Sequence, residues 1–173
     1  MPFAAALGIN DALTLVRAKS PSVLERDLDR PTPFTKRGIF VQRASKGKLF
    51  GVVGFKDVQA GYLKLQVEGG ERTPKGRALI VPVGQRLNKY GNIPRGAVAR
   101  SVANSNVFAG KIKGRAGIYR RNRSGRVKLL VAFEDRATYQ KRLRWSEASS
   151  RQIERRLPDY IARRLLAALS SAR

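Results

Sequence analysis

Apolar residues recur at helical spacing at both ends of the chain. Between residues 3 and 19 they form a loose stripe, which predicts a helix that ends at Ser20-Pro21 because proline interrupts helical hydrogen bonding. Over residues 146–173 arginines occupy positions off a strict apolar stripe, which predicts a long amphipathic helix. Pro158 lies within this stripe and is expected to kink or split the helix. The C-terminal stripe consists of Ile153, Leu157, Ile161, Leu165 and Leu169.

Short runs of β-branched and aromatic residues in the middle of the chain predict strands. These predicted strands are residues 38–43, 48–55, 62–67, 78–83, 117–121 and 127–134. The last two are separated by a turn at 122–125 and predict a hairpin. Residues 84–114 lack periodicity and predict a long loop with one short helix near 97–103. A loop of this length in a compact domain is typically functional or ordered only by a partner.

Together these elements predict one α+β domain: an N-terminal helix, a mostly antiparallel sheet, and a long amphipathic C-terminal helix packed on it. A chain of 173 residues suits a single domain. We expect three segments: an N-terminal helix and Pro-rich arm (1–35), a basic antiparallel β body with a long loop (36–145), and the C-terminal helix (146–173). The arm should be extended around Pro31 and Pro33, because a residue before proline is pushed out of the helical region.

The charge of the chain changes this picture most. The formal net charge is +24, and the stretch between Glu71 and Glu134 contains fifteen basic residues and no acidic one. A block of one sign raises the self-repulsion of the folded state unless a polyanion or an acidic partner offsets it. Contact with nucleic acid would offset this repulsion. The alternative is that the basic hairpin is solvated by water or paired with the acidic residues of a neighbouring subunit. The residues predicted to contact nucleic acid or a partner are Lys111, Lys113, Arg115, Arg120, Arg121, Arg123 and Arg126.

Signals of catalysis are weak. The chain has no Cys and no His, which excludes thiolate chemistry, disulfides, histidine bases and the common zinc sites. Glu134 and Asp135 could hold Mg²⁺ with a third carboxylate such as Asp57, but adjacent strand residues point to opposite faces, so salt bridges are the simpler interpretation. We therefore expect no catalytic residue, no metal and no cofactor. No apolar run is long enough to span a membrane.

Several segments, in order, resemble a family of small proteins encoded among the structural genes of tailed phages and prophages. They are DRPTPFTKRGIFVQRASKGKLFGVVGFKDVQAGYLKLQVEGGERTPKG (29–76), VPVGQRLNKYGNIPRG (81–96), and GIYRRN with VKLLVAFEDRATYQKRL (117–143). The order of PTPFT, KLF, QAGYL, GG and KYGN is specific as a set. This chain departs from the pattern between Lys75 and Val81, where it is shorter.

The resemblance implies a non-enzymatic virion protein, made in the host cytoplasm and similar to head–tail joining and tail-completion (neck) proteins. Such proteins form a ring of roughly six or twelve copies. Expected partners are the chain itself, portal or adaptor and tail proteins, and phage genomic DNA, with no membrane. The residues expected at the subunit interface are Asp27, Asp29, Pro31, Pro33 and Phe34. Two alternatives stay open: a stand-alone RNA- or DNA-binding protein, and a metal-dependent nuclease.

Overall fold

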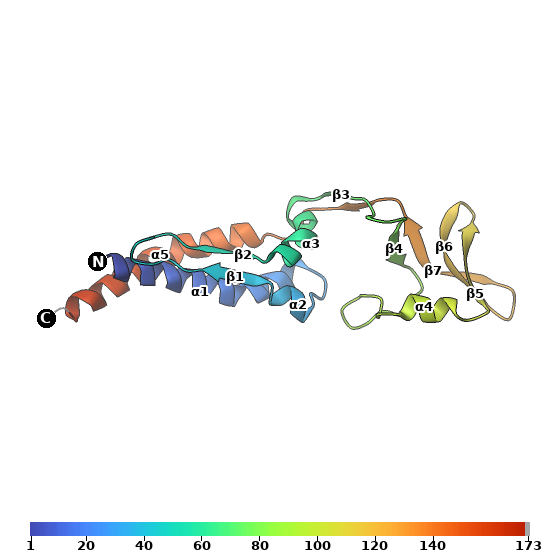
Figure 1. Cartoon of the computed structure of the whole chain (residues 1–173), viewed down its shortest axis with the longest axis horizontal. Helices are drawn as coiled ribbons and strands as arrows, with labels where there is room; N and C mark the ends of the chain where they lie inside the picture. The colour runs from blue at the N-terminus through green and yellow to red at the C-terminus, as the bar shows by residue number, and fades with distance from the viewer. Residues whose placement is uncertain (172–173) are drawn as a thin grey trace. The chain divides into compact units, whose positions relative to one another are not determined.

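The computed structural model describes residues 1–171, and the chain divides into two compact units. Unit 1 comprises Met1–Glu68 and the chain from Lys141 onward, and unit 2 comprises Gly69–Gln140. Unit 2 is thus inserted between two parts of unit 1. The sequence-based segments 1–35, 36–145 and 146–173 cut across this division. Figure 1 labels most of the elements of both units.

Unit 1 is built on two long helices, α1 (Pro2–Asp27) and α5 (Trp145–Ser170), which lie side by side (Figure 1). A Cβ atom at Gly8 would lie 2.8 Å from the Ile161 backbone, so glycine permits the close approach of the two helices there. The Arg164 guanidinium donates to both carboxylate oxygens of Asp11, at 2.7 and 3.0 Å. The helix pair therefore combines close packing with one bidentate ion pair.

Both long helices continue through a proline. The prediction that the first helix ends at Ser20-Pro21 is wrong, because α1 runs on to Asp27. Its last turns hold Leu24, which is fully buried, so tertiary packing offsets the hydrogen bond that proline removes. The α5 helix likewise runs unbroken past Pro158, so the predicted split does not occur.

The remaining elements of unit 1 lie between the long helices in sequence. The strands predicted at 38–43 and 48–55 contain β1 (Ile39–Gln42) and β2 (Val52–Phe55), which pair antiparallel. The Pro-rich arm is not wholly extended, because α2 (Pro33–Lys36) forms one helical turn capped by the Thr32 hydroxyl, which accepts the Thr35 N–H.

The strand predicted at 62–67 is wrong, because α3 (Asp57–Glu68) is a helix. Its inward side chains follow helical spacing: Gln59 and Leu63 are buried, and Val67 packs on the core of unit 1. Six residues of alternating polarity fit a strand as well as part of a helix, and the burial of these side chains decides the outcome.

The core of unit 1 joins its helices to the hairpin. The Trp145 indole N–H donates to the Ser20 hydroxyl at 2.8 Å, and its ring centroid lies 4.7 Å from that of Phe55 on β2. The α5 helix thus packs on the sheet at its start and on α1 along its length. The α+β class is confirmed. The buried members of this core are Val16, Leu24, Ile39, Leu63, Leu143 and Trp145.

Unit 2 contains a four-stranded antiparallel sheet in the order β4-β7-β6-β5. Its strands are β4 (Leu79–Pro82), β5 (Val107–Ile112), β6 (Arg115–Arg121) and β7 (Val127–Glu134). The predicted hairpin around 122–125 and the short helix, α4 (Ala97–Val102), are confirmed.

The sequence-based prediction missed three strands of unit 2. One is β5, which lies inside the predicted loop 84–114. The others are β3 (Gly70–Arg72) and β8 (Ala137–Tyr139), which pair antiparallel with each other. The core of this unit is formed by Val107, Ile118, Leu130 and Val131.

Candidate nucleic-acid interface

Unit 2 carries the whole acid-free stretch and is strongly basic. It holds sixteen basic and three acidic residues. Glu71 pairs with Arg136 at 3.7 Å and Glu134 pairs with Arg115 at 3.0 Å. Within residues 1–171, the other fourteen cations of this unit have no carboxylate within 4.0 Å. Their repulsion is therefore not offset inside the described chain.

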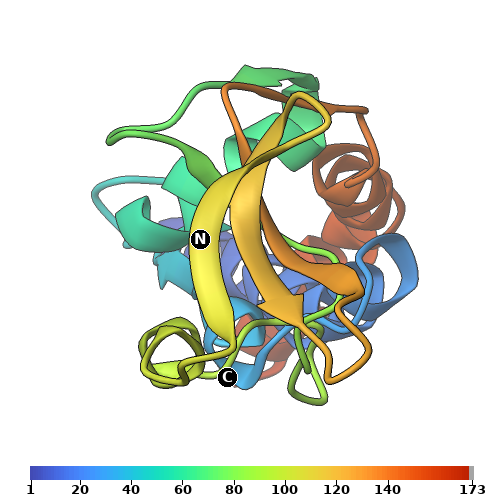
Figure 2. The ribbon, with the colours of Figure 1, turned by 90° about the vertical axis from the view of Figure 1, so that its right-hand side faces the viewer.

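The structure separates the seven predicted contact residues into two groups at opposite ends of β6. The β5–β6 turn carries Lys111, Lys113 and Arg115, while the β6–β7 hairpin tip carries Arg120, Arg121, Arg123 and Arg126. At about 3.3 Å per residue, the strand places the two groups about 20 Å apart. Figure 2 shows the two turns at opposite ends of the β5–β6–β7 meander, with α4 at the same end as the β6–β7 turn but beside β5. A single ligand group cannot contact both.

The hairpin tip concentrates like charges. Arg120 lies directly opposite Lys128 across β6 and β7, and both are exposed. Like charges at opposed strand positions destabilise a sheet, and an anion bound between them would reverse the sign of that contribution. The turn itself is held by backbone hydrogen bonds from Asn122 N–H to Arg126 O and from Gly125 N–H to Asn122 O. The φ of 77° at Gly125 suits glycine.

Two pockets near this end of the sheet have no carboxylate in their lining. The first, of about 540 Å³, lies between the 85–94 loop and α4 and is lined by three cations together with amide and hydroxyl side chains. The second, of about 310 Å³, is lined by Arg121 and Arg123 with Ser105, Asn106 and Asn122 around Phe108. Asn104 lines the first pocket and its chain neighbour Ser105 lines the second, so consecutive residues contribute to the two pockets. We call them together the basic groove, and its cations are Arg86, Lys89, Arg100, Arg121 and Arg123.

The loop that supplies half of this groove is ordered by its own hydrogen bonds. The Asn88 side-chain oxygen accepts the backbone N–H groups of Tyr90 and Asn92, at 2.9 and 3.1 Å. At the far side, the Asn104 amide donates to the carbonyl of Arg100 at 3.1 Å. These bonds hold the polypeptide so that side chains of the 85–94 loop and of α4 line the larger pocket.

Arg86, Lys89 and Arg100 were not among the predicted contact residues, although they lie in the acid-free stretch. No local pattern indicates that this aperiodic loop folds back beside the β6–β7 turn. Net charge was the only signal that could have found them.

The aromatic residues near the groove serve packing. Tyr119 is only 5% exposed, so its ring is not available for base stacking, and its hydroxyl donates to the Arg115 carbonyl at 2.7 Å. Its ring stacks on Phe108 at 6.0 Å, and the Arg121 guanidinium lies 5.5 Å from the Phe108 ring centroid. This cation–π contact helps to hold Arg121 in the lining of the smaller pocket.

The residues predicted to lie at the subunit interface are all in unit 1, but they differ in how far their side chains are exposed and already bonded within the chain. Phe34 is 55% exposed, and Asp29 pairs with its exposed neighbour Arg30. Asp27 is largely enclosed: its side chain accepts the backbone N–H of Arg144 at 2.9 Å and is bonded by Arg26. The Arg26 hydrogen bond is the main cause of a lowered Asp27 pKa. Asp27 therefore links the end of α1 to the start of α5 within one chain. Pro31 is half-buried and Pro33 is exposed.

Among residues 1–171, no three Asp, Glu, His or Cys side chains are grouped so as to hold a metal ion. No helix in the same part of the chain is long and apolar enough to cross a membrane. Comparisons with protein-family models, with curated proteins and with solved structures found no match to this chain.

Proposed function

We propose that this chain is a structural protein of a tailed-phage virion, forming a ring at the head–tail interface or tail end and contacting genomic DNA through the basic groove. The observation that supports the DNA contact is the pair of pockets that are together lined by five cations and no carboxylate. The place in the virion is drawn from the resemblance of residues 29–143 to phage structural proteins. Portal or adaptor and tail proteins would be the neighbouring partners.

The chemistry of the groove suits the phosphate backbone. Arg and Lys neutralise phosphates and release counterions, and side-chain amides donate to phosphate oxygens without reading the base sequence. A neck protein must accept whatever sequence occupies the channel, so contacts of this kind are sufficient. Several copies in one ring would add weak contacts through multivalency. The protein would act without catalysis.

A stand-alone nucleic-acid-binding protein is the second candidate, and the same groove favours it. The two functions differ in where the protein resides, because only a structural protein is incorporated into the particle at fixed copy number. The nuclease alternative requires metal-dependent cleavage that is lost when Glu134 and Asp135 are changed to the amides.

The test is quantitative mass spectrometry of purified phage particles, with the copy number taken relative to the portal protein. A ring subunit should be present at roughly six to twelve copies per particle, the number expected of a closed ring. If the protein is absent from particles but abundant in the lysate, the structural role is refuted and the stand-alone binder is favoured.

A further inference from the structure

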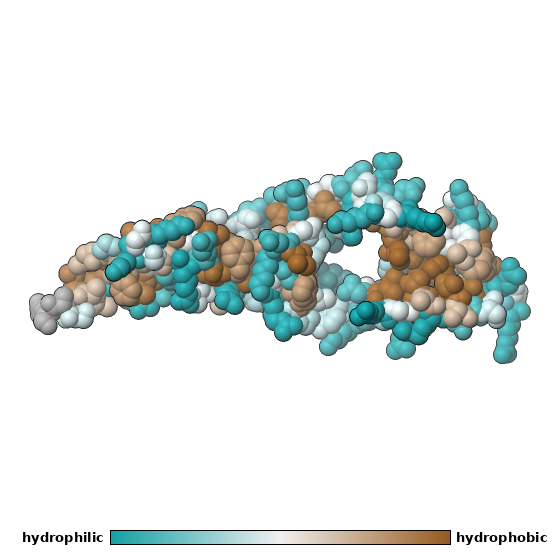
Figure 3. Space-filling view, viewed as in Figure 1, coloured by the Kyte–Doolittle hydropathy of each residue, from teal (hydrophilic) through white to brown (hydrophobic). Residues whose placement is uncertain are grey.

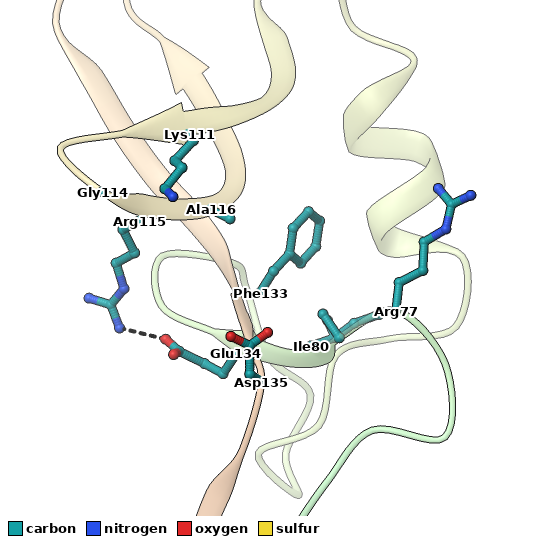
Figure 4. Close-up of a pocket in the computed structure, with 10 residues that line it drawn as sticks. Arg77, Ile80, Lys111, Gly114, Arg115, Ala116, Phe133, Glu134 and Asp135 are labelled. Carbon is teal, nitrogen blue, oxygen red and sulfur yellow. Dashed lines mark hydrogen bonds and ion pairs between the residues drawn. The ribbon is translucent and has the colours of Figure 1, made fainter.

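A pocket of about 740 Å³ lies at the end of the unit 2 sheet that carries the β5–β6 turn. Its apolar surface comes from Ile80 on β4, Phe133 on β7 and Ala116 on β6 (Figure 4). Ile80 and Phe133 are cross-strand neighbours, and Ile80 is 57% exposed. Figure 3 shows the corresponding hydrophobic area over β4 and β7. An apolar side chain of a partner could enter this pocket and cover Ile80 and Phe133.

The border of this pocket contains a carboxylate that is free to bind a cation. Glu134 is already paired with Arg115, as the dashed line in Figure 4 shows. Asp135, in contrast, has no Lys or Arg within 4.0 Å among residues 1–171, although nine of the twelve acidic residues of this very basic chain have one. Arg77 and Lys111 also line the pocket. A complementary segment would present an apolar side chain with a cation placed beside Asp135.

The loop between β1 and β2 in unit 1 has this chemistry. Leu49 and Phe50 are 51% and 55% exposed, and the Lys48 ammonium lies 5.4 Å from the Phe50 ring centroid. No acidic residue occurs between Asp29 and Asp57. The loop therefore offers two apolar side chains and a lysine on one short segment.

This loop is also held in place before any partner binds. The Asn10 side chain on α1 both accepts the Ala44 N–H at 2.8 Å and donates to the Ala44 carbonyl at 3.0 Å. Beyond that anchor, Ser45 and Lys48 exchange backbone hydrogen bonds at 2.9 and 3.0 Å. A segment fixed in this way loses little conformational entropy on docking, which favours its use as a contact.

We propose that the β1–β2 loop of one copy docks into this pocket of a second copy, with Phe50 against Ile80 and Phe133 and with Lys48 beside Asp135. The two surfaces differ, so the contact is heterologous and can repeat from copy to copy until a ring closes. The proposal rests on the proposed function only in that the chain associates with itself. The proposal adds which two surfaces of the chain make that contact.

The test is sedimentation velocity of the full chain over a concentration series, after nuclease treatment and in moderate salt so that nucleic acid does not bridge the molecules. We expect Phe50→Ala and, separately, Ile80→Ser to weaken self-association about tenfold or more, the scale of truncating an interface anchor. Both side chains are exposed, so neither change should unfold the chain. Val58→Ala, at another exposed apolar side chain of unit 1, is the matched control and should leave association unchanged.

A charge exchange tests the orientation of the contact. Lys48→Glu and Asp135→Lys should each weaken association severalfold, and the double variant should recover most of the loss because the pair is restored in reverse. Additive losses in the double variant, or association that ignores Phe50 and Ile80, would overturn the proposal. So would a chain that stays monomeric at every concentration. A chain that stays monomeric would also count against the proposed ring, whereas the variant results concern only these surfaces. The proposed function is tested separately, by the copy number in particles and by DNA binding.

Discussion

Replacing Arg121 and Arg123 with glutamine should weaken DNA binding and flatten its salt dependence. Five cations line the basic groove, and if each neutralises one phosphate, log Kd should change with log salt with a slope magnitude of about 4.5. Removing two should lower that slope to about 2.7. Over a fourfold rise in salt, the affinity of the unmodified chain should fall about 500-fold, and that of the double variant about 40-fold.

The assay is fluorescence anisotropy with duplex DNA of unrelated sequences at several salt concentrations. The matched control is Lys111→Gln with Lys113→Gln, which removes the same charge at the other end of β6, about 20 Å away by strand geometry. This control should keep nearly the full slope. If both pairs reduce the slope equally, binding follows net charge and the groove has no special role. An unchanged slope in the Arg121 and Arg123 variant would refute the assignment outright.

Three further predictions concern stability, each measured by denaturant unfolding monitored by circular dichroism. Asp27→Asn should cost about 1–2 kcal/mol near neutral pH, because the enclosed carboxylate accepts hydrogen bonds. The folded-state pKa of Asp27 is lowered, so this stabilisation is present above the ordinary Asp pKa of about 4 and is lost as the pH falls through the folded value. If the Asp27→Asn variant is still less stable than the unmodified chain in strong acid, this explanation is contradicted. Gly117→Ala should destabilise by about 1–3 kcal/mol, since its Cβ would lie 2.3 Å from the Val131 carbonyl oxygen. Its cross-strand neighbour Gly110 has only ordinary contacts, so Gly110→Ala should be nearly neutral, and equal effects of the two changes would be evidence against this steric explanation. Trp145→Phe should cost about 1–3 kcal/mol through loss of the indole hydrogen bond and core volume, and a neutral result would show that the bond to the Ser20 hydroxyl contributes nothing.

The elements that could be predicted were those with strong local signals. The second hairpin combines apolar runs with an Asn-to-Gly turn, so its strands at 117–121 and 127–134 were found nearly to the residue. The helix α3 was mistaken for a strand because residues 62–67 alternate in polarity, and only the burial of Leu63 and its helical neighbours distinguishes the two. The length of α1 could not be read from the sequence either, because the buried Leu24 lies beyond a proline.

The candidate site, like the fold, could be predicted from the sequence only in part. The acid-free stretch between Glu71 and Glu134 is a property of the sequence, and it lies entirely within unit 2. Which cations share one surface depends on the fold: β6 separates Lys111 from Arg121, whereas the 85–104 loop places Arg100 near the same end of the sheet as the β6–β7 turn. Strand β5, which connects the 85–104 segment to β6, has too little periodicity to be recognised in the sequence. The groove itself could therefore not be predicted.

The central claim is that the basic groove touches DNA inside an assembled particle. The most direct measurement is ultraviolet cross-linking of DNA to protein in intact purified particles, followed by mass spectrometry of the cross-linked peptides. We expect cross-links in peptides that cover residues 85–106 and 120–128, and none in those of α1 or α5. A protein that is present in the particle but cross-links only through other peptides, or not at all, would contradict the claim.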